Sequence, residues 1–192
     1  MTSNKVTGGI LAASGLAAIG LMAIHPTGAA SDQMISGVHG SLMGIMIVQA
    51  AALVFLLGSN GLRDLTACFF FGAGALAGLG AGLLNGFVFP AVRSFGRGEI
   101  GPDIFELIWW TNQMLAELGV IGVGLGYALW SIGLWKAGEK RIGGFGLLAG
   151  LAPGFLLLSG HMGMDLHGAI AAYGLQALWV IAVGWSRWRA VD

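Results

Sequence analysis

The sequence predicts an all-α integral membrane protein, and three observations support this fold class. Of the 192 residues, 56% are hydrophobic and only 9% are charged, whereas a soluble globular domain carries roughly a quarter charged residues. The mean hydropathy of the chain is +0.82. Its apolar runs are also unbroken and about 20 residues long, which suits α-helices crossing a bilayer and not the alternating strands of a β-barrel.

The apolar segments predict a six-transmembrane-helix bundle that forms a single membrane domain over residues 1–192. Proline, glycine and charged residues bound each segment. The fourth segment is longer than one crossing requires, so we expect its first turns, with Trp109 and Trp110, to lie in the membrane interface. The six helices are expected at about 8–24, 37–58, 65–89, 104–134, 142–160 and 167–186.

The first segment also has the pattern of a secretory signal peptide. Lys5 precedes an apolar run that ends near the small residues Gly28, Ala29 and Ala30, which are typical of a cleavage site. We expect the segment to be retained as the first membrane helix.

The basic residues predict an orientation with both termini in the cytoplasm (N-in/C-in). Seven of the nine fall on one side of the predicted bundle, whereas Arg93 and Arg97 fall on the other, and cytoplasmic loops carry the excess of Lys and Arg. The predicted location is the inner (cytoplasmic) membrane, with the histidine-bearing loops facing the periplasm of a Gram-negative cell. The seven residues are Lys5, Arg63, Lys136, Lys140, Arg141, Arg187 and Arg189.

Glycine recurs every four positions on the third and fifth predicted helices. Such small-residue stripes let helix backbones approach closely in lipid, so we expect tight helix packing there. The alternative is that a flat cofactor such as haem lies against a glycine face. The stripes consist of Gly74, Gly78, Gly82 and Gly86, and of Gly146, Gly150 and Gly154.

All four histidines fall at one predicted membrane face. Two hairpins each carry a histidine, an aspartate and a His-Gly pair that opens the returning helix: His25, Asp32 and His39 in the first hairpin, and His161, Asp165 and His167 in the last. Polar side chains near the hydrocarbon usually face the bundle interior and mark a site. The alternative is that these are helix-end histidines bonded to water and headgroups.

We expect the four histidines to bind a transition metal, namely copper, zinc or iron. Neutral imidazole is the commonest protein ligand of these metals, and a carboxylate usually orients the ring or completes the ligand set. Asp165 is the expected carboxylate, and Asp32 is its counterpart in the first hairpin. Methionines near the histidines favour copper, because thioethers select Cu(I); they are Met162 and Met164 after His161, and Met22, Met34 and Met43 near His25 and His39.

Haem b is the competing cofactor. Two histidines on different helices of a bundle can ligate one haem, and a glycine beside each leaves room for the ring. His39-Gly40 and His167-Gly168 fit this pattern.

The fourth segment carries buried polarity. Glu106, Gln113 and Glu117 share one helical stripe, and Glu117 is expected deep in the membrane, where an ionisable group is a functional candidate. We predict that Glu117 is the catalytic, proton-handling group, with Asn85 as its partner. The alternative is a structural hydrogen bond from protonated Glu117 to a neighbouring helix.

The predicted function is binding of a metal ion or haem at the outer face, for redox work or metal handling. One alternative is a membrane-embedded metallohydrolase acting on lipid, and another is a non-catalytic accessory subunit of a larger membrane complex. The expected partners are the lipid bilayer and, in the last case, other membrane subunits. No basic cluster suggests nucleic acid, and the lone Cys68 excludes an internal disulfide.

Overall fold

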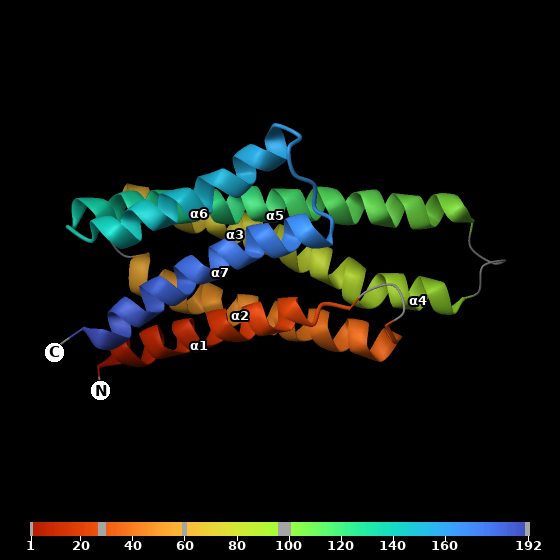
Figure 1. The fold of residues 1–192 in the computed structure, drawn as a ribbon, viewed down its shortest axis with the longest axis horizontal. Coiled ribbons are helices and arrows are strands. Elements are labelled where there is room, and N and C mark those ends of the chain that lie inside the picture. The colour runs from red at the N-terminus through yellow and green to blue at the C-terminus, as the bar shows by residue number, and fades with distance from the viewer. Residues whose placement is uncertain (1, 27–29, 59–60, 96–100, 191–192) are drawn as a thin grey trace.

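The computed structural model describes residues 2–26, 30–58, 61–95 and 101–190 (Figure 1). Within these ranges every regular element is helical, and six helices are long and apolar enough to cross a membrane. The all-helical fold class is therefore confirmed, and the described residues contain as many helices able to span a membrane as the sequence predicts. Gly28, Ala29 and Arg97, which entered the predictions above, lie outside the described residues.

The helices extend beyond the apolar segments at most ends, because polar and charged residues continue them. The third span is one continuous helical rod of 33 residues that contains a π-helical turn, labelled η1. Residues with capping side chains begin two of the helices: Ser31 Oγ accepts a hydrogen bond from Met34 N, and an Asp165 carboxylate oxygen accepts one from Gly168 N. The elements are α1 (Ser3–Ala23), α2 (Asp32–Leu57), α3 (Leu62–Leu83), η1 (Leu84–Val88), α4 (Phe89–Ser94), α5 (Pro102–Lys136), α6 (Lys140–Leu158) and α7 (Leu166–Arg189).

Glycine contacts join the helices into two closely packed groups. One group contains α3, α5 and α6, and the other contains α1 and α7, with α2 packed beside α1 and α3. At each close contact a Cβ on one glycine would overlap the backbone of the other helix, so only glycine permits this separation. The pairs in contact are Gly74 with Gly122, Gly124 with Gly150, and Gly8 with Gly184.

The two ends of the bundle differ. Both chain termini lie at one end (Figure 1), where an Arg187–Glu139 ion pair of 2.8 Å ties α7 to the segment before α6. Near the same end, Trp179 Nε1 donates to the Ile142 carbonyl at 3.1 Å. At the opposite end, here called the histidine end, the last turns of α6 diverge from the start of α7 (Figure 1).

Candidate functional site

A cavity of about 190 Å³ lies between the two groups of helices. Its walls come from α1, α2, α3, α5 and α7, with contributions from η1 and from the loop before α7. The described lining residues are mostly apolar and include no Asp, Glu, Lys or Arg. A ligand in this cavity therefore meets imidazole, thioether, amide and aromatic groups, but no fixed charge from these residues.

His25 and His39 form a pair at the histidine end of this cavity. Their ring centroids are 5.0 Å apart, and the rings are inclined at 76°. His25 follows the end of α1, and His39 lies in the third turn of α2 with only 7% of its surface exposed. Both rings line the cavity, so the structure brings together two of the four predicted ligands.

Hydrogen bonds to the backbone select the tautomer of both rings. His39 Nδ1 lies 2.9 Å from the Ile35 carbonyl oxygen, and His25 Nδ1 lies 3.1 Å from the Pro26 carbonyl oxygen. A carbonyl can only accept, so each Nδ1 carries the proton and donates. In a neutral ring Nε2 then keeps its lone pair, which is the arrangement that backbone carbonyls impose on metal-binding histidines.

The environment of His25 favours its neutral form. Burial lowers the pKa of His25 below its ordinary value of 6.5, and the neighbouring His39 ring lowers it further, whereas the bond to Pro26 acts in the opposite direction. Since the net effect is a lowered pKa, the ring is neutral at neutral pH. Its Nε2 is then available to bind a metal or to accept a hydrogen bond.

Gly86 and the π-helical turn η1 hold His39 in place. A Cβ on Gly86 would lie 2.5 Å from the His39 Cβ, so the two backbones can approach this closely only at glycine. Pro90 has no N–H to donate to the Gly86 carbonyl four residues earlier, and Ser36 Oγ donates to that carbonyl instead, at 2.6 Å. Pro90 thus leaves the Gly86 carbonyl free to accept this hydrogen bond, which joins the third helical rod to α2 beside His39.

Four methionines line the same cavity. Met43 lies one turn after His39 on α2, and its Sδ is 3.3 Å from the position of a Cβ on Gly82; Met46 makes a similar contact at Gly78, with 3.5 Å to its Sδ. The others, Met22 and Met164, are buried. The cavity therefore combines two imidazoles with soft, polarisable thioethers.

Two carboxamides in the cavity wall lack partners. Asn112, 3% exposed, and Gln49 make no hydrogen bond to another described residue, and Asn112 Oδ1 and Gln49 Nε2 are fully buried. By contrast, Gln176 donates to the Val120 carbonyl at 3.1 Å. An unpaired buried polar group costs about 1–3 kcal/mol. No described contact compensates this cost for Asn112 and Gln49.

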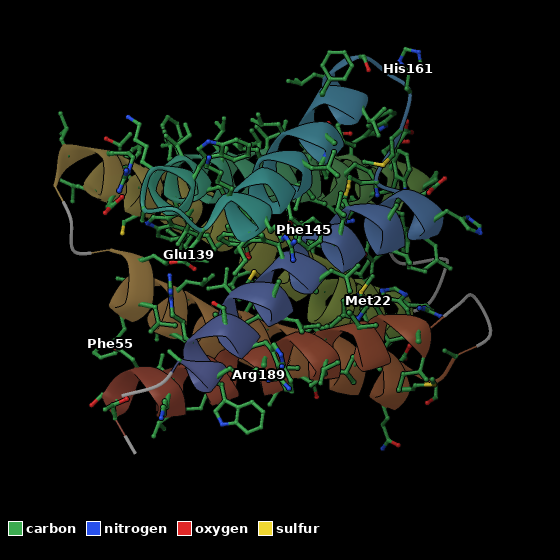
Figure 2. The ribbon with its side chains drawn as sticks, turned by 60° about the vertical axis from the view of Figure 1, so that its left-hand side comes forward. Met22, Phe55, Glu139, Phe145, His161 and Arg189 are labelled. Atoms are coloured by element: carbon green, nitrogen blue, oxygen red, sulfur yellow. The ribbon has the colours of Figure 1, made fainter. Side chains whose placement is uncertain are left out.

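The other two histidines lie at the same end but outside the cavity. His161 is exposed and pairs with Ser159 Oγ at 2.9 Å, and Figure 2 shows it in the loop that follows α6. His167 is also exposed, and neither residue lines the cavity. Among the described residues, no group of three or more His, Cys, Asp or Glu side chains is placed to hold a metal ion.

The aspartates of the two hairpins have other contacts. Asp165 caps α7 through Gly168 N at 2.8 Å, and Asp32 lies 3.7 Å from Arg93 in an exposed ion pair. The structure thus gives both carboxylates local contacts and does not bring them to the His25–His39 pair.

Glu117 is partly buried on α5 and does not line the cavity. No hydrogen bond or ion pair joins its side chain to a described residue, so no described contact links it to the histidines. Its expected partner Asn85 does line the cavity.

The structure does not favour the haem site expected between His39 and His167. His167 is exposed, whereas His39 is buried beside Gly86. The cavity volume of about 190 Å³ is also below the roughly 300–1,000 Å³ of pockets that enclose drug-sized ligands.

Several site residues could not be singled out from the pattern alone. Met46 reads as a packing residue, as most methionines do in a lipid-soluble chain. Pro90, four residues after Gly86, is the local signal that the Gly86 carbonyl is freed. Comparisons with models of protein families, with curated proteins and with solved structures find no significant match to this chain.

Proposed function

We propose that this membrane protein binds a soft transition-metal ion, Cu(I), through His25 and His39. The single observation that carries the proposal is the pair itself: two adjacent imidazoles, each with Nδ1 committed to a backbone carbonyl and Nε2 left free. The proposed ligand set contains two histidines, whereas the sequence analysis predicts four.

The spacing of the two rings supports a shared ion. With metal–nitrogen bonds of about 2.0–2.1 Å, a ring centroid lies about 3.2 Å from the metal, and a tetrahedral angle separates two such centroids by roughly 5.2 Å. The observed separation is 5.0 Å, which is compatible with both rings binding one ion.

The remaining cavity groups favour Cu(I) over zinc or iron. Thioether sulfurs such as those of Met22 and Met43 select Cu(I), and both line the cavity with the histidines. A divalent ion in this apolar setting calls for a carboxylate or thiolate to offset its charge, and the described cavity wall contains neither. A singly charged ion has the smaller desolvation cost.

The biological role we propose is metal handling at the outer face of the inner membrane. The end with the termini carries Lys5, Arg63, Lys136 and their basic neighbours, and the positive-inside rule assigns that end to the cytoplasm. The histidine end then faces the periplasm, from which the ion reaches the His25–His39 pair.

Cu(I) titration of the purified protein under anaerobic, reducing conditions, against a competing chelator, tests the proposal. We expect one ion per chain, and loss of at least tenfold in affinity in His25→Ala and in His39→Ala, because each removes one of two imidazole ligands. His161→Ala and His167→Ala are the matched controls at the same end and should bind as the parent does. X-ray absorption should report both nitrogen and sulfur neighbours of the copper.

Two results would contradict the proposal: no Cu(I) retained by the parent protein, or equal losses in the His161 and His167 variants. The second result would mean that His161 and His167, in the exposed hairpin, also belong to the metal site. A Soret band in the absorption spectrum would instead establish haem.

A further inference from the structure

We propose that a groove between α5 and α6 binds an anionic phospholipid. The groove has a volume of about 220 Å³ and lies at the end of the bundle that carries both chain termini (Figure 1). This inference does not depend on copper, because the histidine pair lies at the other end of the bundle. The residues that line the groove are Ile132, Trp135, Lys136 and Leu147.

Three basic side chains gather at the polar end of this groove. Lys136 ends α5 and Lys140 begins α6, and Arg141 follows. A hydrogen bond of 2.9 Å from Glu139 N to the Leu134 carbonyl closes the tight turn between the two helices. All three basic residues are exposed, and no hydrogen bond or ion pair joins their side chains to any part of the chain that the structure describes.

The acidic residue of the turn does not neutralise this charge. Glu139, labelled in Figure 2, pairs instead with Arg187 of α7 at 2.8 Å. Lys140 and Arg141 also lie in the first turn of α6, which has no acidic residue and no capping side chain. The two cations therefore add to the positive end of the helix dipole, and an anion bound there offsets both.

The apolar part of the groove lies deeper in the membrane than the basic residues. With a rise of about 1.5 Å per residue, Ile132 is about 6 Å nearer the middle of the bundle than Lys136. By the same rise, Leu147 is about 10 Å nearer the middle than Lys140. A cavity of about 150 Å³ holds benzene, so about 220 Å³ admits a segment of one acyl chain.

Trp135 joins the polar and apolar parts of the groove. Its ring packs on α6 at Gly144, where a Cβ would lie 3.0 Å from Trp135 Cζ3, and yet 46% of the residue is exposed. Its indole N–H donates to no described residue. Tryptophan is enriched at membrane interfaces because its ring is apolar and its N–H is polar. This N–H is therefore free to donate to a phosphate or ester oxygen of a lipid.

An anionic phospholipid matches both the depth and the charge of the groove. Ile132 and Leu147 lie on helices long and apolar enough to span a membrane, so the occupant reaches into the hydrocarbon. The three exposed cations select a negative headgroup, and each basic residue near the membrane surface favours an anionic lipid by about fivefold in affinity. Phosphatidylglycerol and cardiolipin have this combination of phosphate and acyl chains.

Native mass spectrometry of the purified protein, titrated with phosphatidylglycerol or with phosphatidylcholine of identical acyl chains, measures the binding. We expect the parent to bind phosphatidylglycerol about tenfold or more tightly than phosphatidylcholine. This affinity should fall about fivefold in Lys136→Gln and in Lys140→Gln, and about 25-fold in the double variant. The matched control is Arg189→Gln at the same end of the bundle, since Arg189 lies on α7 over the Trp185 ring, 4.6 Å from its centroid. That control should bind as the parent does.

A second pair of variants tests the apolar part of the groove. Leu147→Trp fills the groove and should weaken phosphatidylglycerol binding about tenfold, because the acyl chain loses buried contact area. Leu148→Trp is the matched control, since Leu148 is exposed and does not line the groove; it should leave binding unchanged. Water-soluble glycerol phosphate should not displace the lipid, because it has no chain to fill the groove.

Equal affinity of the parent for the two lipids would overturn the inference, because charge would then have no role. Losses in Lys136→Gln and Lys140→Gln no larger than the loss in Arg189→Gln would overturn it too. Equal binding by Leu147→Trp and Leu148→Trp would place the lipid outside the groove. Displacement by glycerol phosphate would show that the phosphate alone is the ligand, which also contradicts the proposal.

Discussion

Replacement of Gly86 by alanine tests whether the close approach of η1 to α2 positions His39. An added Cβ would lie 2.5 Å from His39 Cβ and 3.3 Å from its Cγ, whereas carbon atoms in contact are ordinarily about 3.5–4.0 Å apart. The two helices would have to separate by about 1 Å. That shift also stretches the hydrogen bond of 2.6 Å from Ser36 Oγ to the Gly86 carbonyl.

The expected loss of stability follows from these contacts. Overpacking costs about 1–3 kcal/mol, and a weakened hydrogen bond adds about 0.5–1.5 kcal/mol. The better helix propensity of alanine returns up to about 1 kcal/mol. The net destabilisation is therefore about 0.5–4.5 kcal/mol, and at roughly 2–4 °C per kcal/mol for a chain of this size the unfolding temperature should fall by about 1–18 °C.

The assay is thermal unfolding in detergent, combined with Cu(I) titration of each variant. Gly72→Ala in α3 is the matched control, because its Cβ would meet no other atom within 4 Å and alanine should stabilise that helix by about 0.5–1 kcal/mol. If Gly86→Ala were as stable as Gly72→Ala and bound Cu(I) with the parent affinity, the close contact could not be what positions His39.

Three further predictions concern other parts of the fold. Burial and His39 hold the pKa of His25 below 6.5, so between the lowered pKa and 6.5 the unfolded chain binds more protons than the folded one. The unfolding temperature should fall as the pH drops below 6.5, and His25→Gln should show a smaller fall in a pH series. A double-mutant cycle of Arg187→Ala and Glu139→Ala should give a coupling of about 0.2–1 kcal/mol that declines with added salt, because the pair at 2.8 Å is partly exposed; a salt-independent coupling would contradict this reasoning. Gly124→Ala places a Cβ against the Gly150 carbonyl oxygen and should destabilise the protein by about 3 kcal/mol or more, measured as loss of monodisperse protein on size exclusion.

Some features of this protein follow from the sequence because they depend on local composition. A bilayer rewards any apolar run long enough to satisfy its own backbone hydrogen bonds, so the six spanning helices could be read from the chain. The glycine stripes likewise predicted close helix contacts, and Gly74, Gly78 and Gly150 do lie at such contacts. The position of the histidines at one end also follows, since it requires only helix count and direction.

The composition of the site depends on tertiary packing. Four histidines at helix ends are equivalent in sequence, but the register of α2 against η1 buries His39 and the end of α1 brings His25 beside it. The last turns of α6 diverge from the start of α7 (Figure 1). His161 and His167 lie at this divergence and are exposed. Helix periodicity says which residues share a face, but only the distances between helices decide which faces meet and where a cavity remains.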